Sequence, residues 1–204
     1  TGVPQTSIIS IPAGVEINQF QNRVKSSPMK LCYHGKLDSN RGLMQLISIH
    51  SRLVDIGVDV ELYLHGNGDL TSTLATIKND KIHVTETLDS DDLVQCLSGY
   101  DVGFLPMPDK RIWRLASPLK RGEYLASGMI ILGINHTGHQ MDNSGDWLQL
   151  FDENKFVQSS VDFIRNLDSE RLRQSQINAR EYAEANLDWS HSVTILEDIL
   201  SKQY

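Results

Sequence analysis

The feature that most constrains the fold of this chain is a regular alternation, from residue 30 onward, of short β-rich apolar runs with segments of helical periodicity. Such alternation is typical of a parallel sheet that is covered by helices on both faces. The apolar runs predict strands at 29–35, 59–65, 81–85, 102–105 and 129–134, and we expect one more short strand near Phe156. The sequence therefore predicts a three-layer α/β domain whose sheet is mostly parallel and has about six strands.

Helical patterns occupy the intervals between these runs. Leu43, Leu46, His50 and Leu53 recur at helical spacing, and we expect further helices at 70–77, at 91–97 with Asp89 or Ser90 as its cap, after Ser117, after Ser169 and from Asp188. We interpret 1–204 as a single domain, with residues 1–30 as its entrance and 168–204 as closing helices. Within the entrance, 8–12 is strand-like and 13–20 is rich in turns.

Composition narrows the class of protein. A chain of 204 residues with 40% hydrophobic content can bury one sizeable core. A formal net charge of −7 argues against a broad nucleic-acid-binding surface. The two cysteines lack metal-ligand spacing, which favours free thiols in a reducing compartment, and no apolar run reaches the roughly 20 residues that span a bilayer. We therefore expect a cytoplasmic location and, because the chain starts with Thr-Gly, a fragment of a longer protein.

Ligands of open α/β sheets bind beyond the carboxyl ends of the strands, so the loops after each strand are the places to search. After the first strand, Gly35 lets the backbone turn, and Lys36 and Arg41 place two cations near a helix start, where a diphosphate would fit. After the second strand, Gly66 would let a ligand approach the backbone. After the third, the loop around Leu88 would border a base-sized slot. Solvated loop cations and ordinary turns are the simpler readings of each loop taken alone.

The fourth loop, Ser117 to Gly128, is the most specific of these sequences. Serine is a good helix N-cap, proline fits a first helical turn, and glycine ends a helix. The free amides of Leu119 and Lys120 and the Lys120 cation would support a phosphate. Glu123 lies one turn further along the same face, where its carboxylate would accept two ribose hydroxyls; the simpler alternative is a solvent-facing glutamate.

These motifs, in this order, resemble the C-terminal, donor-binding domain of retaining GT-B glycosyltransferases of the large group 1 (family four) type, a Rossmann-like fold. The resemblance covers nearly the whole chain and rests on 11–20, Gly35-Lys36 with Arg41-Gly42, 66–69, 101–106, 117–128 and the last helices with Trp189. It implies that Lys36 and Arg41 hold the diphosphate and act in catalysis, that the amides of Leu119 and Lys120 support the distal phosphate, and that Glu123 binds the ribose. It also implies a donor linked to UDP or GDP and no separate cofactor.

The chain departs from that family at three points. The family's Glu-x7-Glu would begin at Leu115, so the carboxylate on the sugar side is missing. Pro118 stands where many relatives have glycine, and the usual arginine and lysine appear in reverse as Lys36 and Arg41.

The resemblance predicts transfer of a sugar to a glycan, lipid or other acceptor in glycan biosynthesis, with the acceptor site in an N-terminal domain absent from this chain. The isolated domain would then bind donor but transfer little, and a membrane surface would be reached only through the absent part. A non-catalytic or degenerate nucleotide-sugar-binding module is the alternative, favoured by Leu115. A nicotinamide-dependent oxidoreductase is disfavoured because the first loop lacks the G-x-G-x-x-G fingerprint.

The sequence leaves the roles of the histidines open. His34 and His65 end strands beside glycines and would either face a ligand or pack in the core. His136-x-x-His139 has the spacing of a metal-ligand pair but no partnering cysteine or carboxylate cluster, so we expect no metal. Trp113 and Trp189 are expected to be packing residues.

Overall fold

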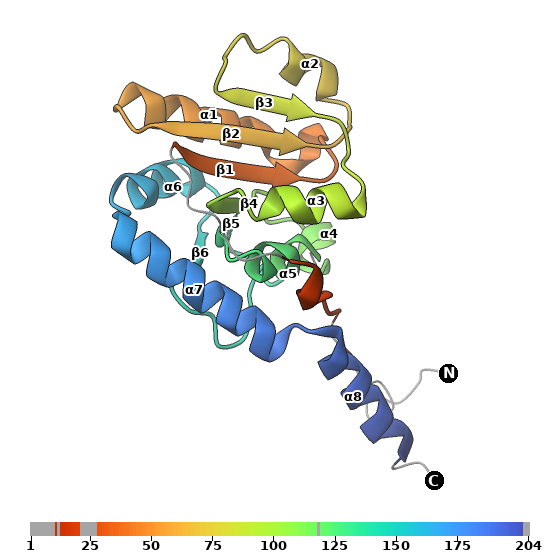
Figure 1. Ribbon diagram of the computed structural model, residues 1–204. Coiled ribbons are helices and arrows are strands. Elements are labelled where there is room, and N and C mark those ends of the chain that lie inside the picture. Colours follow the sequence, from red (N-terminus) through yellow and green to blue (C-terminus); the bar gives the residue numbers. More distant parts are fainter. Residues whose placement is uncertain (1–10, 12, 21–27, 118, 202–204) are drawn as a thin grey trace.

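The computed structural model describes residues 11, 13–20, 28–117 and 119–201. Their central feature is one parallel sheet of six strands in the order β3-β2-β1-β4-β5-β6 (Figure 1). The strands are β1 (Met29–His34), β2 (Val60–His65), β3 (Ile82–Thr85), β4 (Val102–Leu105), β5 (Ile130–Ile134) and β6 (Leu148–Phe151). Every pairing between neighbours is parallel, which confirms the expected α/β architecture.

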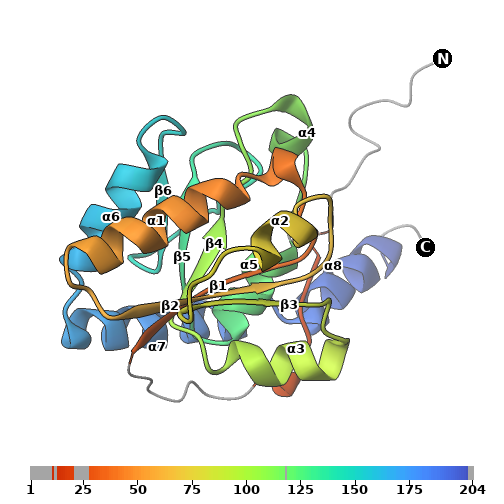
Figure 2. The same ribbon diagram turned by 90° about the horizontal axis from the view of Figure 1, so that it is seen from above.

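Helices cover both faces of the sheet and complete three layers. The α-helices are α1 (Leu43–Asp55), α2 (Thr71–Ala75), α3 (Ser90–Leu97), α4 (Arg111–Arg114), α5 (Leu119–Ala126), α6 (Phe156–Arg165), α7 (Ser169–Asn186) and α8 (Trp189–Ser201). Two short 3-10 turns, η2 (Ile17–Gln19) and η3 (Ser39–Arg41), lie in the loops. Seen from above, α1, α2 and α6 lie on one side of the sheet, and α3, α5 and α7 lie on the other (Figure 2).

The core lies in the two spaces between the sheet and its helices. Strands β4 and β5 at the middle of the sheet are buried along their whole length, as expected for parallel strands covered on both faces. The predicted helix after residue 90 begins as expected, with Asp89 as its cap: the Asp89 carboxylate accepts the backbone N–H of Asp92 at 2.9 Å.

One predicted strand was wrong. We expected a short strand near Phe156, but the sixth strand is β6 at 148–151, and Phe156 is the first residue of α6. Phe156 is fully buried and its ring meets Phe104 edge-on, so a core-facing aromatic at a helix start resembled a strand residue. The four-residue helix α4 was not predicted.

The described part of the entrance segment lies against the junction of α7 and α8 (Figure 1). Val15 donates its backbone N–H to the Leu187 carbonyl at 2.8 Å, and Trp189 donates to the Val15 carbonyl at 3.3 Å. The expected strand at 8–12 falls almost wholly outside the described residues. Among the residues that the structure describes, no helix combines the length and hydrophobicity needed to cross a membrane.

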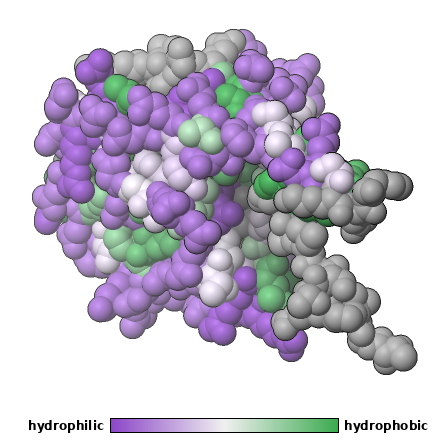
Figure 3. All heavy atoms as spheres, turned by 90° about the horizontal axis from the view of Figure 1, so that it is seen from below, coloured by the Kyte–Doolittle hydropathy of each residue, from purple (hydrophilic) through white to green (hydrophobic). Residues whose placement is uncertain are grey.

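Helix α8 extends away from the rest of the molecule (Figure 1). Its side chains include large hydrophobic residues that are exposed to solvent, among them Val193 and Leu200. The face seen from below in Figure 3, by contrast, is mostly hydrophilic and carries only separate hydrophobic patches.

Candidate functional site

The strand order identifies the place on this sheet where a ligand would bind. Connections lead from β1 toward one edge, through β2 and β3, and from β4 toward the other edge, through β5 and β6. The order therefore reverses between β1 and β4, and open α/β sheets bind ligands in the crevice that such a reversal leaves beyond the carboxyl ends. The two loops that flank it are the one after β1 and the one after β4.

The loop after β1 carries Lys36 and Arg41. Lys36 is exposed, and its backbone carbonyl accepts the Tyr33 hydroxyl at 3.0 Å. The Arg41 side chain is only 20% exposed; its Nε lies 3.6 Å from Oδ2 of Asp38, and its guanidinium carbon lies 4.7 Å from the centre of the Trp113 ring. Trp113, expected only to pack, thus orients Arg41 from the other side of the crevice.

Helix α5, which follows β4 and the short helix α4, brings a third cation to the same crevice. The Lys120 side chain reaches across to the β1 loop, where its Nζ would lie 2.8 Å from a Cβ on Gly35, and it lies 5.7 Å from the centre of the Tyr33 ring. Burial lowers the pKa of Lys120, the charge of Arg41 lowers it further, and Glu123 partly opposes both. A cation held in this way beside another cation would be stabilised by an anion.

The beginning of α5 borders a shallow pocket. The helix starts at Leu119, whose side chain is 57% exposed. The predicted cap at Ser117 and the turn at Pro118 depend on residue 118, which lies outside the described residues. The pocket is lined by Ala13, Gly14, Val15, Ser117, Leu119, Arg121, Gly122 and Leu187.

Glu123 lies one turn into α5 and faces His34, the last residue of β1. Its Oε2 is 3.2 Å from Nε2 of His34, and the two side chains are 25% and 10% exposed. The structure thus places Glu123 beside the crevice with part of its side chain open to solvent.

The loops after β2 and β3 lie further along the same edge of the sheet. Gly66 has a φ of +145°, and a Cβ at this position would collide with the carbonyl oxygen of Gly35, so the close approach of the two loops by itself requires a glycine. Asp69 then accepts the backbone N–H of Ser39 at 2.6 Å and its hydroxyl at 2.8 Å. This loop supports the β1 loop. Leu88 lies half-buried in the loop between β3 and α3.

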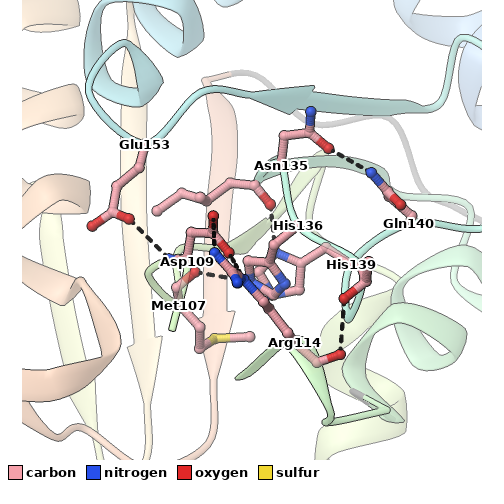
Figure 4. Close-up of polar contacts among 10 residues, drawn as sticks. Met107, Asp109, Arg114, Asn135, His136, His139, Gln140 and Glu153 are labelled. Carbon is pink, nitrogen blue, oxygen red and sulfur yellow. Dashed lines mark hydrogen bonds and ion pairs between the residues drawn. The ribbon is translucent and has the colours of Figure 1, made fainter. Parts of the chain in front are cut away.

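The loop after β5 contacts both α4 and the loop after β4 (Figure 4). The His136 and His139 rings lie 3.7 Å apart between their centres; Nε2 of His136 contacts the Met107 carbonyl at 3.2 Å, and Nδ1 of His139 contacts the Ile134 carbonyl at 2.7 Å. Asp109 pairs with Arg114 at 2.5 and 2.9 Å. This pair of histidines therefore joins loops of the protein to one another.

No three His, Cys, Asp or Glu side chains in the described part of the chain come together as a metal site. Leu115 directly follows α4 and is 77% exposed, so the position where the resembled family has a carboxylate presents an apolar side chain to solvent. Ile112, on the same short helix, is 67% exposed.

Solved protein structures share this fold, although comparisons of the sequence find no match. No protein-family model matches the sequence. No curated protein matches it either. Solved structures do match. A glycosyltransferase from Rickettsia africae ESF-5 is similar with a TM-score of 0.77 and 16% identity, over 98% of this chain and 58% of that one. The pneumococcal O-GlcNAc transferase GtfA, solved with UDP and GlcNAc, is similar with a TM-score of 0.68 and 16% identity, over 95% and 38%.

A third similar structure is the C-terminal domain of the glycosyl transferase group 1 family protein LpcC from Francisella tularensis, with a TM-score of 0.65 and 12% identity, over 86% of this chain and 99% of that domain. The chain thus spans 38% of GtfA and 58% of the Rickettsia protein but matches nearly all of an isolated C-terminal domain. Fold and crevice define a Rossmann-like α/β domain. Its candidate site lies where the strand order reverses between β1 and β4, which is the switch point of the sheet. More particularly, the chain has the fold of the C-terminal half of a GT-B glycosyltransferase of the group 1 type.

Proposed function

We propose that this domain binds the nucleotide diphosphate sugar of a retaining glycosyltransferase. The observation that carries the proposal is the proximity of the Arg41 and Lys120 charges at the switch point, beside the loop that carries Lys36. Two of these cations, Arg41 and Lys120, are largely withdrawn from solvent, and the pKa of Lys120 is lowered by burial and by its neighbour. A diphosphate placed there would relieve that repulsion, and Glu123 would accept the ribose hydroxyls one helical turn away.

In this arrangement the chain contributes electrostatic catalysis. As the bond between sugar and diphosphate breaks, negative charge grows on the leaving diphosphate, and cations already in place stabilise it without reorganising. The loop around Leu88 would border the base. UDP or GDP is the expected nucleotide, and UDP is the one present in the GtfA structure to which the chain is similar. The acceptor, a glycan or a lipid-linked molecule, would bind a second domain of the same protein, so this chain alone should transfer little sugar.

Calorimetric titration of the chain with UDP, GDP and ADP tests the proposal. We expect one of them to bind, Lys36→Ala and Glu123→Ala each to weaken that binding, and Lys78→Ala, which removes an exposed lysine between α2 and β3, to leave it unchanged. If none binds at millimolar concentration, the proposal fails. If binding survives both substitutions, the named residues are wrong.

A second candidate is a nucleotide-sugar-binding module without catalytic activity, favoured by Leu115. The variant Leu115→Glu tests whether the side chain at this position meets the sugar. If Leu115 adapts a working site to a less polar sugar, the new carboxylate should change the affinity for nucleotide sugars while that for the bare nucleotide stays constant. A site that does not engage the sugar would show no change with any nucleotide sugar.

A further inference from the structure

His34 and Glu123 face each other at the mouth of the crevice with unsatisfied polar atoms. Nε2 of His34 and Oε2 of Glu123 are 3.2 Å apart, both atoms are buried, and neither has a well-directed hydrogen bond to any described residue. Buried polar atoms in folded proteins nearly always have partners, so a pair left like this calls for an explanation. Hydrogen bonds at functional sites are often poorly aligned before the ligand binds and tighten in the complex.

The imidazole of His34 is held from behind by the residue next to Glu123. The backbone N–H of His34 donates to the Tyr124 hydroxyl at 3.3 Å, and the Tyr124 ring meets the imidazole edge-on, with 5.1 Å between ring centres and 89° between planes. Tyr124 is fully buried, and its ring occupies the space that a Cβ on Gly103 would need. One helix therefore supplies both the residue that fixes His34 and the carboxylate that His34 faces.

The protonation state of His34 follows from its surroundings. Burial lowers its pKa, the carboxylate of Glu123 opposes that shift, and the charge of Lys120 lowers the pKa further, so the ring is neutral at pH 7. A neutral imidazole has one N–H, and a carboxylate oxygen can only accept, so contact with Glu123 favours the proton on Nε2.

His65, opposite His34 on β2, shows the contrasting case. Its two ring nitrogens are already engaged, Nδ1 with the Thr85 hydroxyl at 2.6 Å and Nε2 with the Tyr100 hydroxyl at 2.7 Å. His65 is thus bound within the protein, whereas Nε2 of His34 is directed at Glu123.

We propose that His34 is a positioning residue for the ribose: it donates its Nε2–H to Oε2 of Glu123 and so holds the other carboxylate oxygen toward the ribose hydroxyls. This inference rests on the proposed nucleotide-binding function. It adds a residue outside the loops that carry the cations, and it explains why a histidine ends β1. The alternative is that His34 only fills space beside Tyr124.

Titration of the full chain with the nucleoside diphosphate that binds best, and with its 2′,3′-dideoxy form, distinguishes the two. We expect His34→Leu to weaken binding of the ribonucleotide by about tenfold, as for loss of one hydrogen bond to a charged group, and to change binding of the dideoxy form by less than about twofold. His34→Gln, which keeps an N–H donor, should recover part of the loss. His34→Leu added to Glu123→Gln should have little further effect, since the two residues act as one unit.

The control is His83→Leu. His83 lies in β3, away from the crevice, and its Nε2 is 3.6 Å from Oε2 of Glu61, so its removal should leave both affinities unchanged. Equal weakening of both nucleotides by His34→Leu, or full additivity with Glu123→Gln, would overturn the inference. If the wild-type chain binds no nucleoside diphosphate, the proposed function and this inference fail together. If it binds and Glu123→Gln has no effect, only the ribose assignment and the role of His34 fail.

Discussion

At the scale of single residues, Lys120 has a charge that the folded protein does not balance. Its ammonium group lies close to the backbone of Gly35, its pKa is lowered by burial and by Arg41, and Glu123 offsets this only in part. An unbalanced cation of this kind is a cost in the free protein that a bound anion removes, which is why perturbed groups concentrate at functional sites.

We predict that Lys120→Met, which keeps the stem and removes the charge, weakens binding of the nucleoside diphosphate by about tenfold or more and leaves binding of the corresponding nucleoside unchanged. Because a repelled cation is removed, the midpoint of thermal unfolding should not fall. Titration and a thermal melt measure the two effects. Lys78→Met is the control, and equal weakening of nucleoside and nucleoside diphosphate would show that Lys120 does not face the phosphates.

Two buried histidines predict how stability depends on pH. Burial lowers the pKa of His65 to about 4, with a smaller contribution from His34, and burial lowers that of His139 to about 3 despite its contact with the Ile134 carbonyl. Unfolding returns both to the ordinary value near 6.5. Above pH 6.5 both states are neutral and stability is full; below it the unfolded state binds protons that the folded state does not, so stability falls toward pH 4 and 3.

Urea unfolding at pH 7 and pH 5 measures this loss. Each histidine should contribute about 1.4 kcal/mol per pH unit below 6.5 to the fall in the free energy of unfolding. The comparison variant is His65→Gln with His139→Gln, whose free energy of unfolding should change less between the two pH values. A wild-type protein equally stable at both would contradict this account of the histidines.

At the scale of elements, the short helix α4 depends on the loop after β5. Arg121 of α5 donates to the carbonyls of Gly138 and Gln140, at 3.4 and 2.7 Å, and Thr137 donates to the Arg114 carbonyl at 3.1 Å. A Cβ at Gly138 would collide with the carbonyl of Trp113, the residue that orients Arg41. The loop therefore fixes one wall of the crevice.

We predict that Gly138→Ala displaces α4 and lowers the free energy of unfolding by about 1–3 kcal/mol, the usual cost of overpacking. Nucleotide affinity should fall with it, because Trp113 would no longer hold Arg41. The control is Gly99→Ala, where a Cβ meets only the Cys96 carbonyl, at 3.2 Å. Unchanged stability and affinity in Gly138→Ala would show that α4 is not held by this loop.

Elements with strong local signals could be predicted from the sequence. Strands β1 to β5 are apolar runs bounded by turns, and the predicted positions agree with the structure to within one or two residues. The edge strand β6 was misplaced because Leu148-Gln-Leu-Phe151 is short and half-buried, while the buried Phe156 gave a stronger apolar signal. Helix α4 has only four residues, too few for a periodic pattern.

The candidate site could be predicted only in part. The loops that carry Lys36, Arg41 and Lys120 follow from strand ends and helix starts. Contacts between loops do not, because nothing in the local sequence around Trp113 or His34 indicates that the first faces Arg41 and the second faces Glu123. Such pairs depend on the reversal of strand order between β1 and β4, which brings distant segments together.

At the scale of the whole molecule, α8 presents an apolar stripe. Trp189, Val193, Leu196 and Leu200 follow one another at helical spacing and are 45%, 50%, 43% and 49% exposed. Contiguous exposed apolar surface of this kind usually marks an interaction site.

We predict that the chain in isolation self-associates through this stripe as its concentration rises, and that Val193→Glu with Leu196→Lys makes it monomeric at the same concentrations. Light scattering coupled to size-exclusion chromatography measures both. Asp198→Asn, on the opposite face of α8, should behave as wild type. A wild-type chain that stays monomeric at every concentration would contradict the prediction.

The central claim is that the crevice at the switch point of the sheet holds a diphosphate. A crystal structure of the chain with the nucleoside diphosphate that binds best tests it directly. The account predicts that the phosphates lie between the side chains of Lys36 and Arg41 on one side and Lys120 on the other, with the ribose hydroxyls on Glu123. A nucleotide bound elsewhere on the molecule, with these side chains unchanged, would contradict it.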